Sequence, residues 1–119
     1  MNLNYFSINE FDSPDLSNSG VNMDREFLQM LDLAREISGV SFRINSGYRT
    51  REHNERVGGK SDSSHLIGKA ADIHCKTSRD RSIVLDSLKQ AGFHRFGIAK
   101  TFIHVDNDSS KSEEVIWLY

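Results

Sequence analysis

Apolar residues recur at helical spacing in two stretches of the chain. From about 23 to 38 they stand three or four positions apart, and Gly39 follows as a stop, so this stretch predicts an amphipathic helix. The stretch 78–91 shows the same spacing and is followed by Gly92, which predicts a second helix. A shorter polar helix is expected over 50–57. The residues expected to face inward are Phe27, Leu28, Leu31, Ala34 and Ile37 in the first helix and Ile83, Val84, Leu85 and Leu88 in the second.

Short apolar or alternating runs predict the strands. Phe42 and Ile44 alternate with polar neighbours, so 40–44 reads as a short strand and 45–49 as the loop after it. The other predicted strands are 70–75, 101–106 and 115–119. Because helices and strands mix without regular βαβ alternation, we expect an α+β fold with a mainly antiparallel sheet flanked by helices.

The first 21 residues differ from the rest of the chain. They are rich in Ser, Asn and Asp and hold the only proline, Pro14, so they predict an irregular arm. The arm is expected to pack on the body through its apolar residues, which are Tyr5, Phe6, Ile8 and Phe11. With 119 residues in all, residues 1–119 are expected to form one small domain.

Composition excludes several classes of protein. Hydrophobic residues make up 37% of the chain and charged residues 27%, as in ordinary globular domains. The net charge of −2 argues against a nucleic-acid partner, which needs an excess of Lys and Arg. A single cysteine, Cys75, excludes an internal disulfide framework.

Targeting signals are also missing from the pattern. The opening residues 1–11 lack a basic segment followed by an apolar one, so no secretory signal is expected. No apolar run reaches transmembrane length, so we expect no membrane partner. We therefore expect a protein made in the cytoplasm, which would need another agent to reach a target outside the cell.

Three residues have the types and order of a metal site. Zinc is commonly held by histidine nitrogens and carboxylate oxygens, and a catalytic site uses three protein ligands. His65 and Asp72 stand seven positions apart, and His104 follows on a later predicted strand. Because side chains alternate along a strand, two neighbouring strands can present Asp72 and His104 together while His65 reaches in from a loop. Gly68 permits the turn between His65 and Asp72.

Each histidine alone has a simpler explanation. His65 alone reads as a surface loop residue, and His104 alone as a core histidine with a hydrogen-bond partner. The ordered set, with small residues where the turn needs them, favours the metal site. We predict one zinc ion per chain, held by His65, Asp72 and His104.

The segment Ser63 to Asp72 has the pattern Ser-x-His-x-x-Gly-x-Ala-x-Asp, and His-x-Asp follows at 104–106. This order resembles the zinc D-alanyl-D-alanine carboxypeptidases and related murein peptidases, whose metal-site architecture is shared with lysostaphin-type peptidases and the hedgehog signalling domain. Other similar segments are 5–11, Ser46-Gly47-Tyr48-Arg49, Glu52-His53-Asn54, Val57-Gly58-Gly59, Phe96-Gly97-Ile98 and the late Trp117.

The resemblance implies roles for further residues. Arg49 would bind a substrate carboxylate or stabilise the developing oxyanion, although an ion pair with a neighbouring acid is the alternative. Ser63 would hydrogen-bond substrate or hold the His65 loop. Several branches of the family carry an acid or histidine two or three positions before the last ligand, where this chain has Phe102 and Thr101.

Asp106 is the nearest carboxylate on the face of His104, and two roles stay open for it. It is the candidate general base, or it orients a ligand histidine from behind. His94 and His53 are weaker candidates for the base.

The function implied by the resemblance is a zinc metallopeptidase that cleaves peptide bonds in peptidoglycan with a zinc-activated water. Carboxypeptidase and endopeptidase modes both remain open. The expected partner is a peptidoglycan peptide, and we expect a monomer. A phage lysis protein, a structural lysin and a bacterial murein enzyme all fit. The alternative is a zinc-holding interaction domain without catalysis, as the hedgehog domain illustrates.

Overall fold

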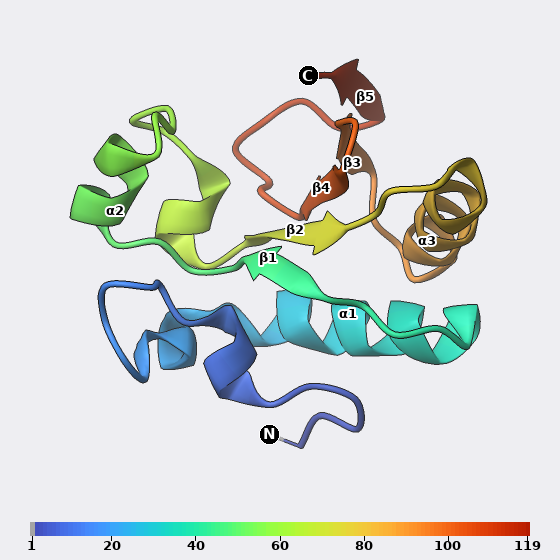
Figure 1. The fold of residues 1–119 in the computed structure, drawn as a ribbon, viewed down its shortest axis with the longest axis horizontal. Helices are drawn as coiled ribbons and strands as arrows, with labels where there is room; N and C mark the ends of the chain where they lie inside the picture. The colour runs from blue at the N-terminus through green and yellow to red at the C-terminus, as the bar shows by residue number, and fades with distance from the viewer. Residues whose placement is uncertain (1) are drawn as a thin grey trace.

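A five-stranded sheet crosses the middle of the molecule (Figure 1) in the computed structural model, which describes residues 2–119. The strands lie in the order β1-β2-β4-β3-β5, and every pair is antiparallel except β3 with β5. Their bounds are Ile44–Ser46 for β1, Ala70–His74 for β2, Arg95–Ile98 for β3, Phe102–Asp106 for β4 and Val115–Leu118 for β5. The prediction of an α+β domain with a mainly antiparallel sheet is confirmed.

Three α-helices flank this sheet, and each begins at a side-chain cap. Asp24, Thr50 and Thr77 accept hydrogen bonds from backbone N–H groups in the first turns of α1, α2 and α3. The helices are α1 (Arg25–Ser38), α2 (Arg51–Arg56) and α3 (Ser78–Gln90), and the short 3₁₀ helices are η1 (Ile8–Phe11), η2 (Ser19–Asn22) and η3 (Ser64–Ile67). The three predicted α-helices are confirmed to within two residues at each end.

One strand prediction needs correction, and one strand was missed. The strand predicted over 40–44 is wrong, because β1 is Ile44–Ser46 and continues into polar residues. Its register with β2 is irregular between Ile44 and Ser46, so pairing with the neighbouring strand decided the boundary. Strand β3 was not predicted, because Arg95 and Gly97 interrupt the apolar run that would have indicated it.

The two faces of the sheet have different roles. Alternation along β2 and β4 sends Ala71, Ile73, Ile103 and Val105 to one face, where they join a buried core. Helices α1 and α3 cover this face and pack against each other (Figure 1). Their buried apolar residues are Phe27, Leu28, Leu31, Ala34, Val84 and Leu88; Ile37, expected inward, is instead 39% exposed. The opposite face carries the polar residues.

On that opposite face, one row of paired residues crosses the whole sheet. Ser46 pairs with Asp72, Asp72 with His104, His104 with Gly97, and Gly97 with Trp117. Asp72 and His104 are thus direct cross-strand neighbours, as expected from their strand positions. The row places the two predicted ligands near the centre of the sheet, with β1 on one side and β5 on the other.

The N-terminal segment packs beneath this body (Figure 1). Phe6 and Phe11 are buried in the core and contact each other edge to face, with ring centroids 5.3 Å apart. The backbone carbonyl of Phe11 accepts a hydrogen bond from the Tyr48 N–H, which ties the segment to the chain just before α2. Within residues 2–119, no helix is long and apolar enough to cross a membrane.

Candidate metal centre

His65, Asp72 and His104 converge on one buried point of the polar face. One ligand atom from each residue lies within 4.8 Å of the others, and all three residues are buried. Asp72 and His104 come from paired positions on β2 and β4, and His65 comes from η3. The sequence therefore predicted correctly which three residues would meet.

The fold sets the orientation of His65 from two directions. The Ser63 side chain accepts a hydrogen bond from the His65 N–H at 3.2 Å and so starts η3. Gly68 ends the turn with a left-handed φ of 71°. The ring Nδ1 lies 2.7 Å from the Gly47 carbonyl oxygen, which can only accept. Nδ1 must therefore carry the proton, and in the neutral ring Nε2 presents its lone pair toward Asp72.

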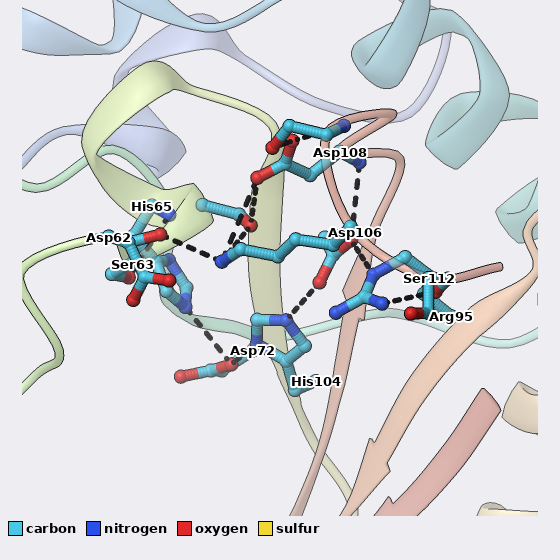
Figure 2. Close-up of polar contacts among 12 residues, drawn as sticks. Asp62, Ser63, His65, Asp72, Arg95, His104, Asp106, Asp108 and Ser112 are labelled. Carbon is cyan, nitrogen blue, oxygen red and sulfur yellow. Dashed lines mark hydrogen bonds and ion pairs between the residues drawn. The ribbon is translucent and has the colours of Figure 1, made fainter.

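His104 lies between two carboxylates (Figure 2). Its Nε2 is 2.8 Å from an Asp106 oxygen, and its Nδ1 is 3.0 Å from an Asp72 oxygen. A proton on Nε2, donated to Asp106, leaves the Nδ1 lone pair directed toward Asp72 in the neutral ring. Both histidines thus direct one acceptor nitrogen to the same carboxylate, and this donor set fits zinc.

The Asp106 carboxylate is itself fully engaged. Its first oxygen accepts from Arg95 Nε at 2.7 Å and from the Asp108 N–H at 3.2 Å, and its second oxygen faces His104. The residue is only 1% exposed. Burial opposes its ionisation, yet the hydrogen bond and charge of protonated His104, together with the hydrogen bond from Arg95, lower the pKa of Asp106. Asp106 is therefore an ionised group packed behind His104.

The three candidate ligands influence each other's protonation. Burial lowers the pKa of His65. Burial also disfavours the charged form of His104, but hydrogen bonds to Asp106 and Asp72 outweigh it and raise the pKa of His104. Although burial opposes ionisation of Asp72, hydrogen bonds from His104 and His65 in their protonated forms hold its pKa far below the usual range when no metal is bound. Asp72 is therefore an anion, as a metal-binding carboxylate must be.

Arg49 approaches Asp72 from the side opposite His104. Its Nη2 lies 3.4 Å from the outer oxygen of Asp72, while Nε donates to Ser46 Oγ at 3.0 Å and Nη1 to Asn54 Oδ1 at 3.2 Å. These contacts hold the guanidinium at the edge of the metal centre. The ion pair that the sequence left open as an alternative is present, and the guanidinium also borders the cleft.

A cleft of about 750 Å³ opens over the three candidate ligands. Arg49, Ser63 and the Gly58-Gly59-Lys60 segment line one part of it, and Phe102, Trp117, Leu118 and Tyr119 line another. Of the described residues, neither His53 nor His94 lines it, and His94 instead pairs with Glu114 at 2.5 Å. The weaker histidine candidates thus lie away from the centre.

Comparison with known families agrees with this geometry. A family model described as Peptidase M15 matches residues 4–106, which is most of the chain. The chain belongs to the Peptidase M15 family. A search of the curated proteins finds no match.

Membership of the M15 family confirms the resemblance seen in the sequence. At the level of the family it implies a zinc-dependent metallopeptidase that acts on peptidoglycan peptides. The matched range contains His65, Asp72 and His104, which are the residues that converge in the structure. The metallopeptidase prediction is thus confirmed at family level.

Two supporting residues in this M15 chain were missed from the sequence. Arg95 is buried and holds Asp106, and its Nη1 also donates to the Ser112 carbonyl (Figure 2). Asp108 accepts from Ser64 Oγ at 2.7 Å and joins the β4–β5 loop to η3. For Arg95, the sequence offered one indication, which is an arginine placed beside Phe96 in a mostly apolar run. For Asp108, the only indication was its position two residues after Asp106.

Proposed function

We propose that this chain hydrolyses peptide bonds in peptidoglycan with one zinc ion held by His65 Nε2, Asp72 Oδ1 and His104 Nδ1. The observation that carries the proposal is the pair of fixed imidazole rings. Gly47 and Asp106 each hold one ring nitrogen, so each ring presents its other nitrogen to Asp72. The group held there would supply Lewis-acid chemistry, namely polarisation of the scissile carbonyl and activation of a water molecule at neutral pH.

Arg49 contacts the substrate in this proposed function. Its guanidinium borders the cleft and is held in place by Ser46 and Asn54. A positioned guanidinium binds a carboxylate through two hydrogen bonds or stabilises negative charge on the carbonyl oxygen. Ser63 lines the same part of the cleft, but its contact with the His65 N–H supports the loop-holding role.

For Asp106 we favour the orienting role over that of general base. A base must reach a proton on the nucleophilic water. The Asp106 carboxylate is buried and already accepts from Arg95, His104 and the Asp108 N–H. A carboxylate behind a ligand histidine fixes the ring and increases its basicity.

The experiment is hydrolysis of purified murein with added zinc and with a chelator. New amino groups without reducing sugar ends are the expected product, and the chelator should abolish their release. Product masses then distinguish loss of a C-terminal D-alanine from cleavage inside the stem. Release of reducing ends as the primary product would overturn the peptidase proposal.

The non-catalytic zinc domain is the second candidate. Among the described residues, the cleft is lined by three carboxylates, those of Asp62, Asp72 and Asp106. Asp72 is a candidate ligand and Asp106 already accepts hydrogen bonds, so the shortage of a free carboxylate to act as base favours this candidate. A protein that binds zinc stoichiometrically but leaves murein intact would support this candidate. The His104→Ala variant is the control for both assays.

A further inference from the structure

The row of paired residues across the sheet ends in an aromatic side chain. Arg49 follows β1 at one edge, Asp72 and His104 lie on the central strands, and Trp117 lies on β5 at the other edge. The metal centre therefore lies between Arg49 and Trp117. Arg49 contacts Asp72 on one side, and on the other side the Trp117 ring centroid lies 5.4 Å from that of His104, so both groups border the metal centre directly.

Gly97 makes room for two aromatic rings beside His104. A Cβ at position 97 would lie 2.4 Å from Trp117 Nε1 and 2.6 Å from Tyr119 Cε2, far inside contact distance. The missing side chain lets both rings lie over β3. The Trp117 ring centroid is 5.4 Å from that of His104, and the Tyr119 centroid is 5.2 Å from that of Phe102.

These rings are not needed to fill the core. Trp117 is half-buried, and Tyr119 is 68% exposed. On one side the Arg95 guanidinium lies 5.1 Å from the Trp117 ring centre, which fixes the indole by a cation–π contact. Both rings line the cleft, and both lie beyond the matched residues 4–106. We call Trp117 and Tyr119 the aromatic wall.

We propose that the aromatic wall binds the substrate peptide on the side of the metal centre opposite Arg49. This inference rests on the proposed function and specifies how the substrate lies in the site. Peptide planes and methyl groups stack favourably on aromatic faces, and a carboxylate does not. A short peptide with a carboxylate at one end and small apolar residues toward the other therefore spans the cleft from Arg49 to the aromatic wall.

Trp117 is the only tryptophan in the chain, so its fluorescence reports directly on the wall. The probe is a synthetic stem pentapeptide ending in D-Ala-D-Ala, added to metal-free protein so that no turnover occurs. Saturable change in tryptophan emission is expected, with the same Kd as that measured by calorimetry. Calorimetric binding without any change in emission would overturn the proposal, and so would the absence of binding.

Variants test the wall independently of zinc loading. Trp117→Leu and Tyr119→Ala should each weaken peptide binding and raise KM roughly five- to tenfold, with kcat and zinc affinity little changed. Trp117→Phe keeps an aromatic face and should restore most of the affinity. Ile116→Ala is the matched control, since Ile116 lies on the same strand, is 52% exposed and is not part of the cleft.

The outcomes separate this inference from the proposed function. If Trp117→Leu and Tyr119→Ala bind peptide and turn over murein like wild type, the aromatic wall does not bind substrate, and the peptidase proposal is unaffected. If wild-type protein leaves murein intact but binds the pentapeptide with the expected emission change, the binding role of the aromatic wall is supported and the peptidase proposal is refuted. Because Tyr119 is largely exposed, its replacement tests the wall even if Trp117→Leu fails to fold.

Discussion

The Nε2 atom of His104 lies 2.8 Å from a carboxylate oxygen of Asp106, two residues further along the same strand. Alternation along β4 puts both side chains on one face, and Arg95 holds the other Asp106 oxygen at 2.7 Å. The imidazole is therefore locked with Nδ1 toward Asp72. A residue that the sequence suggested as a base thus lies behind a candidate ligand.

Replacing Asp106 with Asn distinguishes its two possible roles. If Asp106 orients His104, Asp106→Asn should weaken zinc affinity by roughly ten- to a hundredfold. If it is the proton shuttle, turnover should fall on the order of a hundredfold or more while zinc affinity holds. Zinc affinity and turnover should be measured on one sample. Asp86→Asn is the control, because Asp86 is exposed on α3 and does not line the cleft. Unchanged zinc affinity would contradict the orienting role.

Removing either imidazole should remove the metal. His65→Ala and His104→Ala each delete one of three converging donors, so stoichiometric zinc should be lost in elemental analysis. His94→Ala should keep one zinc per chain, because His94 pairs with Glu114 on the surface. Full zinc retention in both ligand variants would show that the metal is held elsewhere.

Arg49→Lys tests geometry at constant charge. Lysine cannot reproduce the guanidinium contacts to Ser46, Asn54 and Asp72, nor two parallel hydrogen bonds to a carboxylate. Murein turnover should fall at least tenfold, while zinc content and the thermal unfolding midpoint stay close to wild type. A variant that instead loses its zinc would mean that Arg49 supports Asp72 rather than the substrate.

Gly68 should be intolerant of a side chain for two reasons. Its φ is +71°, and a Cβ there would lie 2.3 Å from the Asn22 carbonyl oxygen. Gly39 has a similar φ of +68° but open space around it. Gly39→Ala should therefore cost about 1 kcal/mol of unfolding free energy, and Gly68→Ala roughly 1–3 kcal/mol more. Urea denaturation of the metal-free proteins measures both; equal costs would show that the close contact can relax.

Asp108 should make stability depend on pH in the acid range. Burial opposes its ionisation, but hydrogen bonds from Ser110 and Ser64 lower the pKa of Asp108 from 3.8 to about 2. A lowered pKa in the folded state stabilises the fold above the unfolded value and loses that effect as pH falls through the folded value. The difference in unfolding free energy between wild type and Asp108→Asn should thus shrink between about pH 5 and pH 2. Metal-free protein is required, and a constant difference would contradict the prediction.

The sequence by itself determined the candidate ligands and most of the elements. His65, Asp72 and His104 could be found because strand alternation and the turn at Gly68 depend on residues that are close in the sequence. The helices were predictable for the same reason, since their apolar spacing and caps are readable within a single turn or two. Family resemblance added the reaction class.

Only the tertiary structure decided how the ligands are held. The Gly47 carbonyl orients His65 from 18 residues away, and Arg95 holds Asp106 from a neighbouring strand. Strand β3 was missed because Gly97 lowers strand propensity, and its pairing with β4 and β5 overrides that local preference. That same glycine leaves the space in which Trp117 lies beside His104. Such relationships depend on pairing between distant segments, and local sequence patterns do not record them.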